Sequence, residues 1–223
     1  MGRFLREFRS YTKLDGGVVR FIDAIPRLSD ATSVTPFDAH YFYMSSWAMR
    51  RIHEARPSLH VDIGGPVALI ACVAAIVPTI FADYRPLEAT ASDLISVGSD
   101  LRYLPLQDGS VRSLSCLHVA EHVGLGRYGD PLDPLGTVKA AQELARVLAP
   151  SASLYFALPI GLPRVHFNAH RVHSPAAVID MFPDLSLGEF SAVTDEGKYV
   201  EDVRPDALER ARYACGLFHF VRR

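Results

Sequence analysis

The sequence predicts one α/β domain with a mainly parallel, doubly wound sheet of about seven strands and an antiparallel strand near the C-terminus. Three observations lead to this fold class. Short runs rich in β-branched residues alternate with helical stretches. The first run ends in two glycines that lead into an uncharged helix. The second run ends in Asp83, at the distance from Asp62 that a βαβ unit requires.

The first βαβ unit is predicted over residues 59–83. Strands at 59–63 and 79–83 flank a buried helix over 67–77. Pro66 suits the first turn of that helix, where a backbone N–H is not needed, and Pro78 ends it.

The later elements continue the alternation. A helix is predicted over 139–148, and Pro150 ends it before the next strand. The remaining strands are expected at 94–97, 111–119, 153–158 and, as an antiparallel pair that closes the sheet, at 185–193 and 216–221.

Residues 1–50 are expected to be an N-terminal helical extension of the domain at 51–223. Arg3, Arg6, Arg9 and Lys13 surround apolar side chains there, which indicates a small amphipathic helix on the domain edge; the alternative is a weak contact with a membrane surface. The start of the chain lacks the apolar core of a secretory signal. The longest uncharged run, 64–81, is interrupted by prolines and is too short to be a transmembrane segment.

Composition limits the partners. A chain of 223 residues with 49% hydrophobic residues can bury one core, and its net charge of −2 argues against a nucleic-acid partner. A small molecule is therefore the expected partner. Cys72, Cys116 and Cys215 are too scattered for a zinc or redox motif, so we expect reduced core residues in a cytoplasmic protein.

Three acids follow successive predicted strands. Asp62, Asp83 and Asp100 come at or just after the first, second and third strand ends. In an open parallel sheet the ligand lies beyond these ends. An acid after the second strand can accept hydrogen bonds from both ribose hydroxyls, and an acid after the third can accept one from an adenine amino group. The acids therefore outline a nucleoside pocket.

These residues belong to a larger set that resembles the ordered motifs of class I S-adenosylmethionine-dependent methyltransferases. The resemblance covers residues 58–160 and implies a Rossmann-like methyltransferase fold with S-adenosylmethionine as cofactor. The set comprises Asp62, Gly64, Gly65 and Asp83; Asp100, Leu101, Pro105, Asp108 and Ser110; His118, Glu121 and His122; and the segment 146–150. The cofactor-binding residues that it implies are Asp62, Gly64, Gly65, Asp83, Asp100, Leu101 and His118.

Segments 37–43, 124–134 and 167–171 resemble more narrowly a bacterial family, domain of unknown function 268. That resemblance spans nearly the whole chain. It implies a methyltransferase-like protein associated with surface-polysaccharide synthesis, and it implies no particular reaction.

One position departs from the methyltransferase pattern. Three glycines usually follow the first acid at alternate positions, whereas Gly64, Pro66 and Ala68 stand there. Proline offers neither the conformational freedom of glycine nor an N–H donor. Either Gly65 provides the close approach, or the chain is a methyltransferase-shaped protein that binds or scaffolds glycan-assembly components without methyl transfer.

His118, Glu121 and His122 also match a His-x-x-Glu-His pattern whose histidines bind zinc on a helix. Here the pattern directly follows a strand, so the two imidazoles need not face one centre, and we predict no metal. The histidines either cap loop backbone or take part in catalysis.

The loops after the fourth and fifth parallel strands are expected to bind the acceptor. Their side chains mix planar donors, acceptors and rings, which suits a sugar, although they could instead tie the loops together. The expected reaction is methyl transfer to a hydroxyl of a small polar acceptor, a sugar or surface-glycan precursor, with His122 or His170 as the base and Glu121 beside it. The expected acceptor-binding residues are Arg127, Tyr128, Asp130, His166, Asn168 and Arg171.

Overall fold

A computed structural model describes residues 1–223, which divide into two compact units, Met1–Phe37 and Asp38–Arg223. The sequence suggested a boundary after residue 50. The structure assigns helix α2 (Ala39–Ala55) to the larger unit, because Met44, Trp47 and Ile52 on this helix are buried against the sheet.

The smaller unit consists of helix α1 (Gly2–Leu14), a 3₁₀-helix (Phe21–Asp23) and irregular chain. Phe4 stacks on Phe8, and Phe8 meets Phe21 edge to face. The N-terminal stretch is thus helical, with an aromatic side. No helix in either unit is both long enough and apolar enough to span a membrane.

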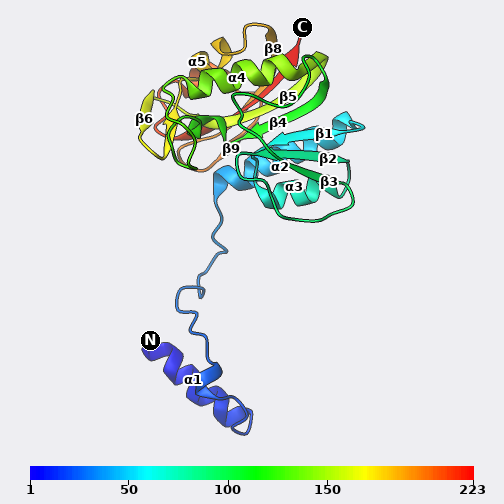
Figure 1. The fold of residues 1–223 in the computed structure, drawn as a ribbon. Helices are drawn as coiled ribbons and strands as arrows, with labels where there is room; N and C mark the ends of the chain where they lie inside the picture. Colours follow the sequence, from blue (N-terminus) through cyan, green and yellow to red (C-terminus); the bar gives the residue numbers. More distant parts are fainter. The chain divides into compact units, whose positions relative to one another are not determined.

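The larger unit contains a mixed eight-stranded sheet in the order β3-β2-β1-β4-β5-β10-β8-β9 (Figure 1). The first five strands in this order are parallel, and β10 is antiparallel to both of its neighbours. A separate hairpin is formed by β6 (Arg164–His166) and β7 (His170–Val172). The sheet strands are β1 (His60–Ile63), β2 (Thr79–Asp83), β3 (Leu94–Gly98), β4 (Val111–Leu117), β5 (Leu148–Ile160), β8 (Leu185–Val193), β9 (Tyr199–Val200) and β10 (Ala214–Arg222).

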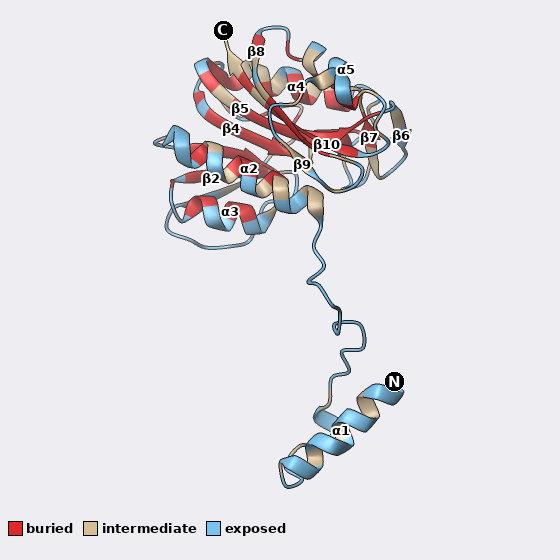
Figure 2. Cartoon of the chain, turned by 180° about the vertical axis from the view of Figure 1, so that it is seen from behind, coloured by how far each residue is buried: buried red, intermediate tan, exposed pale blue.

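Helices cover both faces of the sheet, as β5 shows. Leu154, Phe156 and Leu158 belong to a core with α4 (Gly136–Val147) and α5 (Pro175–Asp180), whereas the alternate residues Tyr155 and Ala157 belong to a core with α2 and α3 (Val67–Ala74). Because side chains alternate across a strand, the two cores lie on opposite faces. The central strands are accordingly buried along most of their length (Figure 2).

The predicted fold class is confirmed, with an eighth, two-residue strand beyond the seven expected. The segment 79–83 is a strand with the predicted bounds, and so is 185–193. Helix α4 ends at Val147, before Pro150, but the predicted strand start at residue 153 is wrong, because β5 starts at Leu148 and runs through Pro150. An irregular register against β4 accommodates this, with Ser151 at φ +58°.

Some smaller expectations also need correction. The strand predicted over 111–119 stops at Leu117, before the backbone turns at His118. Cys116 and Cys215 are buried, but Cys72 is exposed on α3 and is no core residue.

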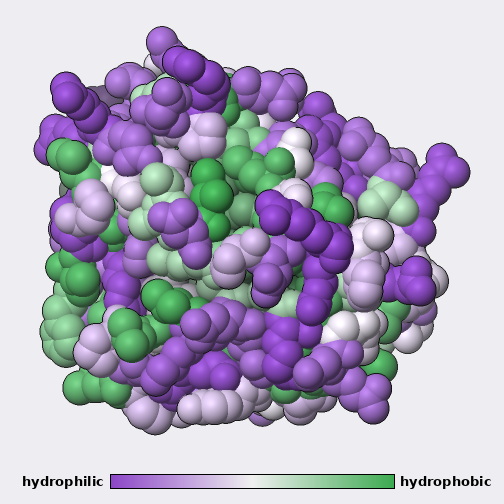
Figure 3. All heavy atoms as spheres, turned by 90° about the horizontal axis from the view of Figure 1, so that it is seen from above, coloured by the Kyte–Doolittle hydropathy of each residue, from purple (hydrophilic) through white to green (hydrophobic).

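From above, hydrophilic residues cover most of the visible face, with hydrophobic residues between them (Figure 3).

Candidate active site at the carboxyl edge of the sheet

The carboxyl ends of β1 to β4 meet at one edge, and the strand order reverses between β1 and β4. Ligands of open α/β sheets bind at such a point. A cavity of about 90 Å³ lies there. Its lining includes five of the residues predicted to hold a cofactor: Gly64, Asp83, Asp100, Leu101 and His118. It also includes three residues predicted for other roles: His122, Tyr128 and Asp130.

Gly64 and Asp83 form the part of the cavity nearest the glycine turn. Gly64 has φ +62°, and a Cβ at this position would lie 2.9 Å from Asp83 Oδ2 and 3.0 Å from Val119 Cγ1. Asp83 uses Oδ1 to accept a hydrogen bond from the backbone N–H of Arg85 at 2.6 Å. Asp83 lines the cavity and no group of the chain donates to its Oδ2, so Asp83 has an acceptor to offer a ligand.

Asp62 was expected to bind the cofactor but lies beneath the cavity wall, out of contact with the cavity. It is fully buried and does not line the cavity. Its carboxylate accepts hydrogen bonds from the backbone N–H of Gly65, at 2.8 Å, and from the Ser115 hydroxyl. Burial raises the pKa of Asp62 to about 7 against the opposing effect of these two donors. Asp62 and Gly65 therefore fix the shape of the glycine turn from beneath it.

Asp100 lines the cavity but is already paired. Arg102 donates from Nη2 to Asp100 Oδ2 at 2.6 Å and from Nε to Oδ1 at 3.0 Å. These hydrogen bonds from Arg102 hold the pKa of Asp100 below its ordinary value. Leu101, which is buried, follows as an apolar wall. Of the three acids, Asp83 is thus the one with an oxygen left for a nucleoside.

Tyr128 and Asp130 lie on the cavity side, away from the acceptor position expected for them. The Arg85 guanidinium lies 4.2 Å from the centre of the Tyr128 ring, and both side chains line the cavity. Asp130 accepts a hydrogen bond from the backbone N–H of Gly124 at 2.6 Å, which holds the loop after β4. The Arg85–Tyr128 stack limits the volume of the cavity.

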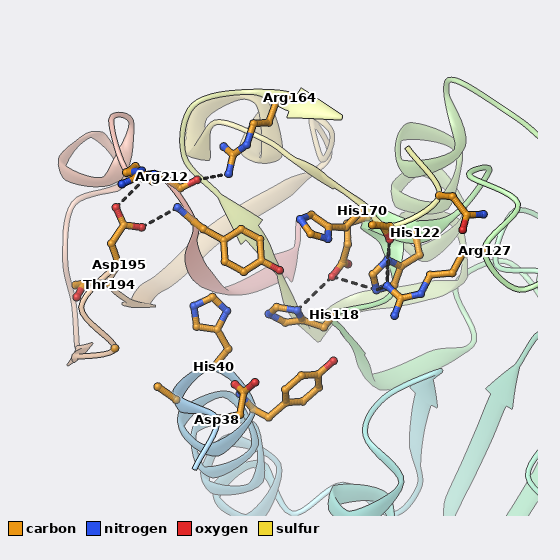
Figure 4. A pocket seen from close by; sticks show the side chains of 17 residues that line it. Asp38, His40, His118, His122, Arg127, Arg164, His170, Thr194, Asp195 and Arg212 are labelled. Atoms are coloured by element: carbon orange, nitrogen blue, oxygen red, sulfur yellow. Dashed lines mark hydrogen bonds and ion pairs between the residues drawn. The ribbon is translucent and has the colours of Figure 1, made fainter. Parts of the chain in front are cut away.

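A much larger cleft, of about 1060 Å³, adjoins the cavity (Figure 4). His118 and His122 line both spaces. The cleft is bounded by the start of α2, the loop after β4, the β6–β7 hairpin and the chain before β10. Among the residues expected to bind an acceptor or act as the base, Arg127, Asn168, His170, His122 and Glu121 line this cleft.

Glu121 lies buried between the two histidines. Its Oε1 atom is 3.2 Å from His118 Nδ1 and 3.6 Å from His122 Nε2, while neither oxygen makes a hydrogen bond of good geometry. Burial opposes a charge on Glu121, but His118 and His122 outweigh it and lower its pKa. Glu121 is therefore an ionised carboxylate that can stabilise a positive charge on either ring.

His122 has a defined orientation. Its Nδ1 atom lies 2.6 Å from the carbonyl oxygen of Ala169, which assigns the proton to Nδ1 and leaves Nε2 as an acceptor. Burial, with smaller contributions from Arg127 and His118, lowers the pKa of His122 below 6.5, although Glu121 opposes this. His122 is thus neutral at neutral pH and able to take a proton.

His118 stands at the tip of β4 with φ +58°, a left-handed conformation that is uncommon outside glycine and costs free energy. This turn directs the ring toward Cys215, whose Sγ lies 3.1 Å from His118 Nε2. Burial opposes a charge on the ring, but Cys215 and Glu121 raise the pKa of His118 well above 6.5.

Two of the expected acceptor residues, Arg171 and His166, line neither the cleft nor the cavity. Arg171 is 6% exposed and donates to the carbonyl oxygens of Val123 and Asp133, so it ties loops together. His166 is exposed; its ring packs on His170 with centroids 4.9 Å apart, and Arg164 donates to it at 2.8 Å.

The cleft also contains residues that the sequence did not single out. His40 comes from the first turn of α2, and its ring stacks on Tyr213 at 5.3 Å. Asp195 accepts hydrogen bonds from the backbone N–H groups of Arg212 and Tyr213, each at 2.7 Å. The contact between His40 and Tyr213 joins residues 173 positions apart, so no spacing rule could have found it. The Asp195 contacts join residues 17 and 18 positions apart. His40 alone carried a signal, because it belongs to the segment 37–43 that resembles a known family.

Comparisons with known proteins concern the family and the fold. A family model described as "Caenorhabditis protein of unknown function, DUF268" matches residues 110–207. It is the family that the sequence resembles, although the description names Caenorhabditis where bacterial proteins were expected and the match is shorter than the whole chain. No curated protein matches the sequence.

Solved structures match over most of the larger unit. The N-methyltransferase NodS from Bradyrhizobium japonicum WM9, in complex with S-adenosyl-l-homocysteine, is 14% identical, with a TM-score of 0.58 over 87% of this chain and 92% of that one. The fold is that of the Rossmann-like methyltransferases. The YcgJ protein from Bacillus subtilis is 13% identical, with a TM-score of 0.55 over 82% and 99% of the two chains.

The cyclase SpnF is 10% identical, with a TM-score of 0.59 over 81% of this chain and 80% of that one. Proteins named for different reactions thus resemble this chain in fold, so the reaction has to be argued from the site.

Proposed function

We propose that the chain is an S-adenosylmethionine-dependent methyltransferase that acts on a hydroxyl of a small polar acceptor, a sugar or surface-glycan precursor. One observation carries the proposal: His118 and His122 line both the cavity at the carboxyl edge of the sheet and the large cleft. A cofactor on one side and an acceptor on the other would meet at these histidines.

The residues at the sheet edge fit the nucleoside end of the cofactor. Asp83 Oδ2 can accept hydrogen bonds from ribose hydroxyls, Gly64 leaves room beside it, and Leu101 and Val119 give apolar walls. S-adenosylmethionine supplies the methyl group when bound. The cavity of about 90 Å³ is below the roughly 300 Å³ of a typical ligand pocket, so binding requires the Arg85–Tyr128 stack to move.

His122 is the base in this proposal. Its neutral ring accepts the proton of the acceptor hydroxyl at Nε2 while Nδ1–H stays bonded to Ala169 O. Positive charge then arrives 3.6 Å from the buried carboxylate of Glu121, which stabilises it. His170 lies in the same cleft and is the second choice, because no carboxylate lies against its ring and its closest ring partners are His166 and Tyr213.

The cleft offers groups that a sugar can use. Arg127 and Asn168 provide planar donors at its wall, and Tyr41 and Tyr213 provide aromatic faces. Arg164 and Arg212 also line it, so the acceptor can carry a negative charge. Positioning of a hydroxyl by such groups, with removal of its proton, is most of what a protein can add to methyl transfer.

A second candidate function is favoured by Pro66. It is the residue before α3 and offers no N–H at the place where a cofactor's amino-acid end would approach. A methyltransferase-shaped protein that binds glycan-assembly components without cofactor would explain this proline.

Calorimetry with S-adenosyl-l-homocysteine distinguishes the two. The methyltransferase proposal expects saturable binding near micromolar strength, about 8 kcal/mol, and a loss of at least about tenfold in Asp83→Asn because the ribose loses an acceptor. Asp93→Asn, at an exposed position, is the matched control. No heat at millimolar ligand with a folded protein would refute methyl transfer and favour the cofactor-free function.

A further inference from the structure

Three metal-binding side chains converge where α2 meets the sheet. The ligand atoms of His40, His118 and Cys215 all lie within 4.8 Å of one another. His118 Nε2 and Cys215 Sγ are 3.1 Å apart, and the rings of His40 and His118 have centroids 5.7 Å apart. The three residues come from the first turn of α2, the tip of β4 and β10. Only the tertiary fold brings them together.

The orientation of His118 is set for metal binding. Its Nδ1 atom lies 3.2 Å from Glu121 Oε1, so a proton on Nδ1 faces this carboxylate and the Nε2 lone pair remains for a metal. A carboxylate behind a metal-binding histidine is the usual arrangement at zinc sites, because it fixes the tautomer and raises the basicity of the ring. Glu121 is fully buried, and neither of its oxygens has a hydrogen-bond partner of good geometry, so both are available to a charged or metal-bound histidine.

The cluster is also open on one side. His40 and His118 line the large cleft, and the close-up shows both rings bordering the same space (Figure 4). Cys215 is buried and does not line the cleft. Two imidazoles and a thiolate are ligands that suit zinc rather than magnesium or calcium. Three protein ligands with a free fourth position are typical of catalytic zinc sites.

We propose that His40, His118 and Cys215 bind one zinc ion whose fourth ligand, a water molecule or an acceptor hydroxyl, comes from the cleft. When the ion binds, the Cys215 thiol and the Nε2–H of the charged form of His118 each lose a proton to solvent. This proposal replaces the expectation of no metal, which rested on the scattered cysteines and on the pair His118 and His122. It does not rest on methyl transfer, since the site needs neither Asp83 nor the cofactor cavity.

The test uses the full chain, without an affinity tag, after removal of metal with a chelator. Cobalt(II) is the probe, because a thiolate ligand gives it a charge-transfer absorption and tetrahedral coordination gives it intense visible bands. One equivalent of cobalt is expected to bind with both signals, and zinc is expected to displace it. Cys215→Ser should abolish the charge-transfer absorption. His40→Gln should weaken binding at least tenfold, and Glu121→Gln by about 10–100-fold.

Cys72→Ser and His166→Gln, both at exposed positions, are the controls and should leave the titration unchanged. Circular dichroism verifies that each variant is folded, and His40→Gln provides the test if Cys215→Ser does not fold. The proposal is overturned if no saturable cobalt signal appears, or if the signal persists unchanged in folded His40→Gln and Cys215→Ser. Binding of S-adenosyl-l-homocysteine is measured separately, so either proposal can fail alone.

Discussion

Arg51 and Glu189 form a two-pronged ion pair that ties α2 to β8. Arg51 Nε lies 2.7 Å from Glu189 Oε2, and Arg51 Nη2 lies 2.8 Å from Oε1, which also accepts a hydrogen bond from Trp47 Nε1 at 3.0 Å. Because α2 carries His40 and Tyr41 into the cleft, this pair helps to hold one wall of the site in place.

Glu189→Gln is expected to lower the free energy of unfolding by about 2 kcal/mol at neutral pH, since it removes charged hydrogen bonds from a partly buried position. Burial opposes ionisation of Glu189, but Arg51 and Trp47 outweigh it and lower its pKa from 4.5 to about 2. Because the pKa of Glu189 is lower in the folded than in the unfolded protein, its ionised form stabilises the fold fully above pH 4.5. This stabilisation is lost as the pH falls toward 2. Urea unfolding of both proteins should therefore show a difference that shrinks between pH 4.5 and about pH 3. A constant difference, or an equal effect of the exposed Glu88→Gln, would contradict the role of the pair.

Gly64→Ala is expected to reduce affinity for S-adenosyl-l-homocysteine more than tenfold. The new methyl group would lie 2.9 Å from Asp83 Oδ2, and φ +62° costs a non-glycine residue about 1 kcal/mol. Gly98→Ala is the matched control at the end of β3, where the nearest atoms are 3.6 Å away. Calorimetry on both variants tests this, and equal affinities would show that the ligand does not use the glycine turn.

The pH dependence of His122 can be followed by NMR on metal-free protein. Its pKa is expected below 6.5, because burial disfavours the charged ring. Glu121→Gln should lower it further, since the carboxylate supports the imidazolium form. If His122 is the base, turnover should be constant at neutral pH and fall as the pH drops through this value. A pKa above 6.5, or an increase in Glu121→Gln, would rule out this assignment.

Arg171→Met is expected to cost about 2–3 kcal/mol of stability, because the carbonyl oxygens of Val123 and Asp133 lose a charged donor inside the protein. Asn168→Gly should leave stability nearly unchanged, since glycine tolerates the φ of +62° found there, and should weaken acceptor binding. Thermal unfolding separates the two. A large loss of stability in Asn168→Gly would make that residue a loop tie as well.

The parallel half of the sheet could be predicted because its signals are local. A short apolar strand, a glycine turn and an acid at the end of the next strand all lie within about 20 residues, which is the span of one βαβ unit. Helix α2 also left a local signal, since Met44, Trp47, Ala48 and Ile52 recur at helical spacing and are buried. That spacing would have moved the boundary of the extension before residue 39.

The roles of the acids could not be predicted from strand ends alone. Like Asp83, both Asp62 and Asp100 stand at the end of a strand. However, the Asp62 carboxylate accepts a hydrogen bond from Ser115, far along the chain, and the Asp100 carboxylate from Arg102, two residues later. The partners of His118 pose the same difficulty, because Cys215 lies 97 positions away. Contacts of this length depend on the order of strands in the sheet, and sequence spacing carries no record of that order.

The central place of β10 has a consequence for how the protein is made. In the sheet β8 is joined to β5 only through β10, although β8 is synthesised first. On the ribosome, β8 can pair with the short strand β9 on one side, but its other edge and the edge of β5 stay open until residues 214–222 follow. Open edges invite pairing with other chains. The nascent chain is therefore prone to aggregate until β10 has been synthesised and has paired with β5 on one side and β8 on the other.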